Sequence, residues 1–319
     1  MLPTIALLDD YSNQAHQYAD WHGQSFANVE FFSEPFTDED SLVSALQHVQ
    51  AVGLMRERTP FPASVIQRLP NLELIVTSGK KNASIDVSAA QKQGVTVCGT
   101  ESPGHATAEL AFLLLMTLTR KLIPLVNDLK NDNQWQSAMG SDLRGKTLGI
   151  LGLGRLGQQL AGFANAMGMN VIAWSENLTE ENCVPHNVQY VTREALFEQA
   201  DSISIHLRHS ARTHGLVNAD DLTRLGSHGF IINTSRAEIV NLDDLQQALD
   251  NDVIAGAAFD VFDVEPTPKD HWMINHPRVL ATPHIGYCTN ETFDVFYSQM
   301  LEAFEAYYSG APIRVISTR

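Results

Sequence analysis

Residues 147–176, TLGILGLGRLGQQLAGFANAMGMNVIAWSE, decide the fold of this chain. The apolar run Thr147–Leu151 leads into the glycine-rich turn 152–157, GLGRLG, and the turn opens a helical pattern over Arg155–Met167. A second apolar run follows at Asn170–Trp174. A strand, a turn, a helix and a strand in this order predict a βαβ unit of the kind that binds dinucleotides.

Each glycine of this turn has its own task. Gly152 permits a tight turn, Gly154 lets the backbone approach a pyrophosphate, and Gly157 permits close contact between helix and sheet. The N-terminus of the following helix offers free N–H groups to the phosphates. This combination predicts a nicotinamide-dependent oxidoreductase.

The residue that reads the cofactor's ribose is less clear than the phosphate site. An Asp or Glu is expected at the end of the second strand, about 20 residues on, to hold the 2′-hydroxyl group. Ser175 occupies the strand end itself, and Glu176 follows it. No Arg or Lys lies close by in the sequence to bind a 2′-phosphate, so NAD is favoured and NADP stays open.

Length and composition limit the class of protein. A chain of 319 residues suggests two domains, and 44% apolar with 18% charged residues is typical of a globular protein. The formal net charge of −16 argues against nucleic acid or an anionic membrane as partner. The N-terminal MLPTIALLDD resembles a strand more than a signal peptide, and no apolar run approaches the length of a membrane span. A cytoplasmic location is therefore expected.

Short apolar runs alternate with helical patterns almost from end to end, which predicts an α/β fold with parallel sheets. Helices are expected at Asp38–His48, Asp86–Gln93, Ala106–Arg120, Asn218–Leu225, Leu242–Leu249 and Glu291–Ser309, with a polar stretch around Asn127–Gly140. The expected strands are Thr4–Leu8, Val29–Phe32, Ala51–Met55, Leu72–Thr77, Val95–Cys98, Thr147–Leu151, Asn170–Trp174, Ser202–Leu207, Phe230–Thr234, Ile254–Phe259 and Val279–Ala281.

Three segments of the second half carry candidate catalytic groups: NTSRA at 233–237, DVFDVEP at 260–266 and PHIG at 283–286. Arg236 offers a planar fork that can pair with a carboxylate and polarise the adjacent carbonyl. His284 suits acid/base work because its unperturbed pKa is about 6.5. Glu265 would orient the imidazole and raise its pKa if it accepts a hydrogen bond from it.

Together with GLGRLG, these segments closely resemble the D-isomer-specific 2-hydroxyacid dehydrogenase family. The family includes phosphoglycerate dehydrogenases, glyoxylate/hydroxypyruvate reductases and D-lactate dehydrogenases, and the resemblance covers essentially the whole chain. It implies two Rossmann-like domains with the active site in the cleft between them, and it assigns catalysis to Arg236, Glu265 and His284. We assign residues 1–101 plus 287–319 to a substrate (catalytic) domain and residues 102–286 to the dinucleotide-binding domain.

The resemblance also implies a homodimer, in which Trp135 lies near the partner subunit, and a small anionic 2-keto or 2-hydroxy acid as substrate. Beyond the glycine turn, it implies cofactor contacts from Thr107, Arg155, Leu156, His206, Thr213, Thr234, Arg236, Asp260, His284 and Gly286.

The substrate loop is expected in the first domain. Residues 78–83, SGKKNA, follow a strand, so the loop can present backbone N–H groups to an anion. In the family this loop binds the substrate carboxylate, which indicates Lys81, Asn82 and Ala83 alongside Arg236 and His284. The family more often has a glycine-rich loop here, so the two lysines are a departure. Arg56 and Arg58 could add positive charge at the same sheet edge.

Two other functions remain open at this point. The family contains NAD(H)-responsive corepressors that retain the dehydrogenase core, so a binding protein with little turnover is one alternative. Formate dehydrogenase-like chemistry is another, disfavoured because that family uses glutamine where Glu265 stands. The histidines show no HExxH-like spacing and the three cysteines are scattered, so no metal is predicted.

Overall fold

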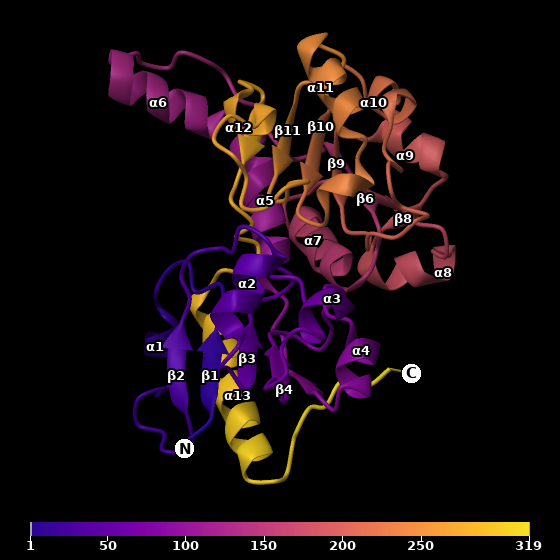
Figure 1. Cartoon of the computed structure of the whole chain (residues 1–319). Coiled ribbons are helices and arrows are strands. Elements are labelled where there is room, and N and C mark those ends of the chain that lie inside the picture. The colour runs from indigo at the N-terminus through magenta and orange to yellow at the C-terminus, as the bar shows by residue number, and fades with distance from the viewer. Residues whose placement is uncertain (1, 319) are drawn as a thin grey trace. The chain divides into compact units, whose positions relative to one another are not determined.

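The computed structural model describes residues 2–318, which divide into two compact units. Residues 2–103 and 288–318 form the first unit, and residues 104–287 form the second. Figure 1 labels most of the helices and strands of both units. Each unit is an α/β fold around its own parallel sheet, so the prediction of two parallel-sheet α/β domains is confirmed.

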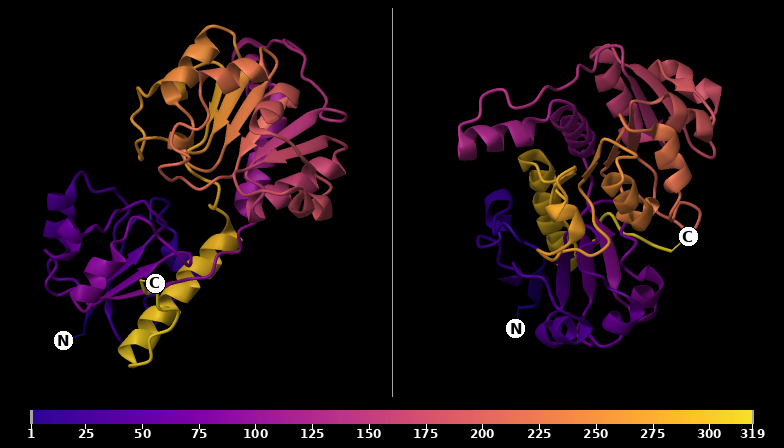
Figure 2. Two further views of the ribbon diagram at one scale, coloured as in Figure 1. Left: turned by 90° about the vertical axis from the view of Figure 1, so that its right-hand side faces the viewer. Right: turned by 90° about the horizontal axis from the view of Figure 1, so that it is seen from above.

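The first unit has a five-stranded sheet in the order β2-β1-β3-β4-β5, with every neighbouring pair parallel. Helices α2 to α4 pack on one face, while α13 packs on the other, where a Cβ on Gly53 would face Phe304 and Met300. Figure 2 shows α13 in yellow along this sheet. The elements are β1 (Thr4–Leu7), α1 (Ala15–Tyr18), β2 (Asn28–Phe31), α2 (Glu39–Leu46), β3 (Ala51–Leu54), α3 (Ala63–Ile66), β4 (Leu74–Thr77), α4 (Val87–Lys92), β5 (Thr96–Gly99) and α13 (Asn290–Tyr308).

The second unit has a seven-stranded sheet in the order β12-β11-β10-β9-β6-β7-β8, again parallel throughout. Its strands are β6 (Thr147–Leu151), β7 (Asn170–Trp174), β8 (Gln189–Tyr190), β9 (Ser202–Ile205), β10 (Phe230–Asn233), β11 (Gly256–Phe259) and β12 (Val279–Ala281). Its helices are α5 (Ala106–Thr119), α6 (Leu122–Asp132), α7 (Arg155–Ala166), α8 (Glu180–Cys183), α9 (Arg193–Gln199), α10 (Ala219–Leu225), α11 (Leu242–Asp250) and α12 (Trp272–Asn275).

The central strands are buried along their length, because helices cover both faces of each sheet. This explains their nearly unbroken apolar sequence. Helix starts are fixed by side-chain caps: Asp38 forms a capping box for α2, Asn218 forms one for α10, and Thr289 caps α13. Within residues 2–318, no helix is both long enough and apolar enough to cross a membrane.

Two predicted features need correction. All the expected strands are present, but β8 was missed because its two residues are exposed and carry no apolar run. The stretch around Asn127–Gly140 was expected to be merely polar, yet helix α6 extends to Asp132. The helix was missed because none of its residues is buried, so its apolar positions do not mark a core-facing stripe.

Candidate active site

The glycine turn after β6 has the geometry that each of its glycines permits. Gly152 has φ of +106°, and a Cβ there would lie 2.9 Å from the backbone of His206. A Cβ on Gly157 would lie 2.3 Å from the carbonyl oxygen of Gly152, so a side chain there would prevent helix α7 from packing closely against the turn. A Cβ on Gly154 would project into open space, where a bound phosphate could approach. Helix α7 then begins at Arg155 with no side-chain cap on its N–H groups.

Two buried polar atoms lie at the same edge of the sheet without partners. Nδ1 of His206, just after β9, and Oγ1 of Thr234, just after β10, make no hydrogen bond within the described chain. The other ring nitrogen of His206 lies 2.8 Å from Oγ of Ser204. Buried polar atoms are normally satisfied, so this pair fits a ligand with hydroxyl and phosphate groups. Uncapped N–H groups and unsatisfied edge atoms together match a dinucleotide.

Three further predicted cofactor residues follow strands β7 and β9 of the same sheet. Ser175 follows β7 directly and is half-buried, whereas Glu176 is exposed in the next turn. Thr213 organises the loop after β9: its hydroxyl accepts the N–H of Ser210 at 2.8 Å and donates to the carbonyl of Arg208 at 2.7 Å. The Thr213 hydroxyl is therefore already engaged in holding its own loop.

His284 and Glu265, two of the predicted catalytic residues, form a close polar pair. Nδ1 of His284 lies 2.6 Å from Oε2 of Glu265, and Oε1 accepts the N–H of Phe262 at 2.9 Å. Burial raises the pKa of Glu265, but the hydrogen bond and charge of His284, the Phe262 N–H and the charge of Arg236 outweigh it and hold the pKa below its usual value. Glu265 is therefore an anion that orients the imidazole of His284 through Nδ1.

The backbone at His284 is held in an unusual conformation. Its φ of +51° lies in the left-handed region, which a non-glycine residue adopts only when its surroundings enforce it. Asp260 provides that enforcement: Oδ1 accepts from Oγ1 of Thr282 at 2.6 Å and from the Ile285 N–H at 2.8 Å, and Oδ2 accepts from the Gly286 N–H at 2.7 Å. Burial raises the pKa of Asp260, and these three hydrogen bonds oppose the rise.

Three residues predicted as cofactor contacts therefore support the loop of His284. Asp260 clamps it, and Oγ1 of Thr107 on α5 donates to the carbonyl of Gly286 at 2.9 Å. A Cβ on Gly286 would lie 3.0 Å from Oδ2 of Asp260, which explains the glycine. These contacts make the loop a rigid mount for the imidazole.

Arg236 projects from the end of β10. The side chain of Asn233 ties this turn together: its amide donates to the carbonyl of Arg236 at 2.9 Å, and its oxygen accepts the N–H of Ser235 at 2.9 Å. The guanidinium donates to the carbonyl of Ser235 at 2.7 Å, and its charge is felt at Glu265. The second unit thus brings together a cation, an imidazole and a carboxylate next to the dinucleotide turn.

The predicted substrate loop follows β4 in the first unit. Asn82 is 8% exposed, and its amide is fully engaged: Nδ2 donates to Oγ1 of Thr77 and to the carbonyl of Arg56, and Oδ1 accepts from Ser84. Asn82 therefore shapes the loop. Lys81 is exposed, and the N–H of Ala83 donates to Oε1 of Glu57 at 3.2 Å.

The basic residues near this loop are only partly available. Lys80 pairs with Glu101 at 2.6 Å, and the guanidinium of Arg58 lies 4.6 Å over the ring of Tyr11. Arg56 donates to the carbonyl of Ser78. Most of the positive charge expected at this sheet edge is thus balanced or anchored within the first unit.

Sequence reasoning missed two residues next to the predicted groups. The ring of Tyr287 meets that of His284 edge to face, with centroids 5.7 Å apart, and its position just after PHIG could have suggested it. Glu57 contacts the substrate loop, and an acid between two arginines after a strand was the available signal. Both residues adjoin groups to which the sequence analysis assigned chemistry.

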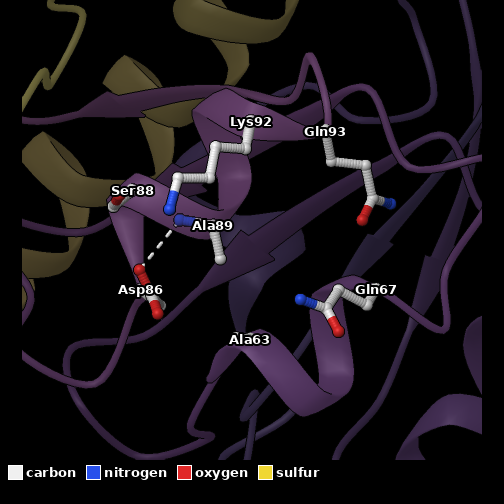
Figure 3. A pocket seen from close by; sticks show the side chains of 7 residues that line it. All are labelled: Ala63, Gln67, Asp86, Ser88, Ala89, Lys92 and Gln93. Carbon is white, nitrogen blue, oxygen red and sulfur yellow. Dashed lines mark hydrogen bonds between the residues drawn. The ribbon is translucent and has the colours of Figure 1, made fainter.

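A separate groove of about 410 Å³ lies between α3 and α4 of the first unit (Figure 3). Gln67, Asp86, Lys92 and Gln93 line it, and the Asp86 carboxylate already accepts the N–H of Ala89 as the cap of α4. None of the predicted site residues lines this groove. Within residues 2–318, no group of three or more His, Cys, Asp or Glu side chains could hold a metal ion.

Comparison with protein families gives one clear match. The model described as "D-isomer specific 2-hydroxyacid dehydrogenase, NAD binding domain" matches residues 112–286. This range contains the glycine turn and all three of Arg236, Glu265 and His284.

Individual relatives agree with this match. A D-3-phosphoglycerate dehydrogenase of Bacillus subtilis (strain 168) is 35% identical over 263 residues, which are 82% of this chain and 50% of that protein. A glyoxylate reductase of Korarchaeum cryptofilum is 29% identical over 91% of this chain and 86% of its own length. The crystal structure of a phosphoglycerate oxidoreductase from Vibrio cholerae superposes with a TM-score of 0.90 at 32% identity, covering 97% of this chain and all of that one. The chain spans about half the length of the D-3-phosphoglycerate dehydrogenases of Bacillus subtilis and Rattus norvegicus that it matches.

His206, whose Nδ1 atom is buried, makes a testable contribution to stability. Burial lowers the pKa of His206 to about 4, from about 6.5 in an unfolded chain. Between these values the unfolded chain binds more protons, so acidification destabilises the fold. Replacing His206 with Gln removes this term. The unfolding free energy of both proteins should fall when the pH is lowered from 7.5 to 5. We expect the decrease to be about 2 kcal/mol smaller in the variant than in the wild type.

Urea unfolding at the two pH values measures this difference. His16→Gln is the matched control, because His16 is exposed, and its pH dependence should follow the wild type. Equal losses in the wild type and in His206→Gln would contradict a buried, neutral His206.

Proposed function

Because the chain belongs to the D-isomer-specific 2-hydroxyacid dehydrogenase family, we propose that it transfers a hydride reversibly between a nicotinamide dinucleotide and C2 of a 2-keto or D-2-hydroxy acid. The observation that carries this proposal is the 2.6 Å contact between His284 and Glu265, with the charge of Arg236 beside it. An imidazole with an anion on Nδ1 is prepared to give or take a proton at Nε2.

Each residue has a defined part in the proposed reaction. The nicotinamide supplies or accepts the hydride when it is bound. In reduction, Nε2 of His284 gives a proton to the developing alkoxide oxygen, and in oxidation it removes the proton from the hydroxyl. Glu265 stabilises the charged imidazolium and fixes its orientation. Arg236 binds the carboxylate through two parallel hydrogen bonds and polarises the carbonyl.

We assign the carboxylate-binding loop to Lys81, Asn82 and Ala83, with Asn82 as the residue that shapes it. The exposed ammonium of Lys81 and the backbone N–H groups of the loop suit a small anion. In a chain with a net charge of −16, such a local site is needed to attract an anionic substrate.

The proposed cofactor is NAD. Ser175 and Glu176 follow β7, where the adenine ribose is held in this fold. The carboxylate of Glu176 can accept a hydrogen bond from a ribose hydroxyl and would repel a 2′-phosphate. Both effects favour NAD over NADP.

We further propose that the protein is a homodimer joined through α6 and the segment that follows it. Leu122, Ile123 and Leu129 are each more than 40% exposed on α6, and Trp135 and Met139 are more than 70% exposed. A helix of 11 residues with no buried side chain is marginal by itself in water. A second copy of the same face would bury these apolar groups and stabilise both helices.

The first prediction concerns the reaction itself. The test acids are glyoxylate, hydroxypyruvate, pyruvate and 2-ketoglutarate. The wild type should oxidise NADH with at least one of them. With the same acid, kcat/KM for NADPH should be at least tenfold lower than for NADH. The measurement is the loss of absorbance at 340 nm. Tight NADH binding without turnover of any 2-keto acid would favour a binding protein instead, and NAD reduction by formate would favour formate dehydrogenase-like chemistry.

The second prediction concerns the acid/base pair. His284→Ala should lower kcat by about 10²- to 10⁴-fold while the Kd for NADH changes little, because the imidazole acts on the substrate proton. His276→Ala is the matched control, since His276 also pairs with a carboxylate, Asp250, at 3.3 Å. Its kcat should stay within about twofold of the wild type. Parallel losses of kcat and NADH affinity in His284→Ala would count against the assigned role.

The third prediction concerns the dimer. Ile123→Glu combined with Leu129→Glu should convert the dimer to a monomer, because four charges would enter one apolar interface. Sedimentation equilibrium measures the mass. Val184→Glu, at another exposed apolar residue of the same unit, should leave the dimer intact. A wild-type protein that is already monomeric at micromolar concentration would overturn this assignment.

A further inference from the structure

The loop after β4 presents a run of backbone donors. Within the described residues, the N–H groups of Lys80, Lys81 and Asn82 make no hydrogen bond to the protein, and that of Ala83 donates to Oε1 of Glu57 at 3.2 Å. Successive free N–H groups in a turn are a typical anion-binding arrangement. A carboxylate of the chain itself therefore occupies one end of this arrangement.

Several hydrogen bonds that do not involve Glu57 hold the loop. Asn82 ties it to Thr77, to Arg56 and to Ser84, and its side chain is 8% exposed. At the other end, the N–H of Gly79 donates to Oγ1 of Thr100 at 2.8 Å, and the carbonyl of Gly79 accepts the Thr100 N–H at 3.2 Å. The loop is thus clamped at both ends to neighbouring strand ends. The Glu57 contact adds little to its shape but places a negative charge on it.

The two arginines beside Glu57 in sequence each donate a hydrogen bond to a backbone carbonyl. Arg56 donates through its guanidinium to the carbonyl of Ser78, and Arg58 donates to the carbonyl of Asp9 while stacking on Tyr11. Glu57 itself lies at the carboxyl end of β3, next to β4 in the sheet. Its position places the carboxylate within reach of the loop from the adjoining strand.

We propose that Glu57 is a specificity-determining residue: its carboxylate competes with the substrate carboxylate for the Ala83 N–H and sets how tightly the loop binds an anion. This inference rests on the proposed function, which assigns the substrate carboxylate to residues 81–83. A substrate carboxylate bound to the Ala83 N–H would lie close to the negatively charged carboxylate of Glu57, which accepts a hydrogen bond from the same group. Glu57 has to move away before the acid binds fully.

This arrangement gives the loop selectivity against simple anions. An anion that binds only to the N–H groups must displace a carboxylate that is already attached to the chain. A 2-keto acid also makes other contacts with the protein. The binding free energy from those contacts exceeds the cost of displacing Glu57. Glu57 therefore affects KM, whereas kcat depends on His284 and Arg236.

The test uses the full chain with saturating NADH and two probes. Calorimetry with oxamate, a 2-keto-acid-shaped carboxylate that is not reduced, gives a Kd without turnover, and glyoxylate gives kcat and KM. Glu57→Ala should lower both the oxamate Kd and the glyoxylate KM by about 5- to 20-fold, the effect of removing one charged competitor for one hydrogen bond. The kcat should stay within about twofold. Glu57→Gln should fall between Glu57→Ala and the wild type, because its amide oxygen still accepts the N–H without a charge.

Glu34→Gln is the matched control, an exposed glutamate of the same unit at a different place on the surface. Its oxamate Kd should equal that of the wild type, and an equal decrease in Glu34→Gln would assign the effect to overall charge and overturn the proposal. An unchanged or higher oxamate Kd in both Glu57 variants would also overturn it. If Glu57→Ala does not fold, Glu57→Gln carries the test. A wild type that reduces no 2-keto acid refutes the proposed reaction, while the oxamate Kd values still decide the role of Glu57.

Discussion

Every hydrogen-bonded strand pair in both sheets is parallel, and this single constraint places the candidate site residues. Parallel strands end at the same edge, so residues far apart in sequence meet there. In the second unit, the glycine turn after β6, His206 after β9, Thr234 after β10 and Asp260 after β11 all share one edge. In the first unit, Glu57 after β3 and Ala83 after β4 meet for the same reason. Both sets of contacts follow from strand direction before any side-chain chemistry is considered.

The loop that positions His284 shows how a buried charge can fix the conformation of a segment. Asp260 is almost fully buried, and its two oxygens accept three hydrogen bonds from a short segment of chain. A buried carboxylate is unfavourable unless it is satisfied in this way, so the segment around it is strongly fixed. That fixation holds His284 at a positive φ and directs its ring to Glu265. The hydrogen bonds that satisfy the buried Asp260 are thus the same ones that hold His284 at its strained positive φ.

Much of the fold could be predicted from the sequence because buried parallel strands leave an apolar run that local inspection finds. The strands around the glycine turn were predicted with the bounds that the structure gives. Helix α6 was missed because its apolar residues face outward, and β8 because it is too short and exposed to carry a pattern. At the site, residue type and order identified Arg236, Glu265 and His284 as a group. The same reasoning could not predict that the side chain of Asn82 makes its hydrogen bonds within its own loop and to neighbouring segments. Such bonds cannot be recognised from a local sequence motif.

The charge balance of the first unit bears on the anion site proposed for the loop after β4, which would rely on backbone N–H groups. Of the basic groups near the loop, Lys80 is paired with Glu101, and Arg56 and Arg58 are anchored to carbonyl groups. An exposed lysine such as Lys81 attracts an anion, but solvent and salt screen its charge, so it does not fix the orientation of the anion. Backbone N–H groups on a clamped loop keep their direction whatever the salt concentration, so they provide the geometry that a carboxylate needs. In an acidic chain, the anion most readily available to such a loop is one of its own carboxylates. The contact between Glu57 and Ala83 is what the proposed anion site would favour on a negatively charged protein.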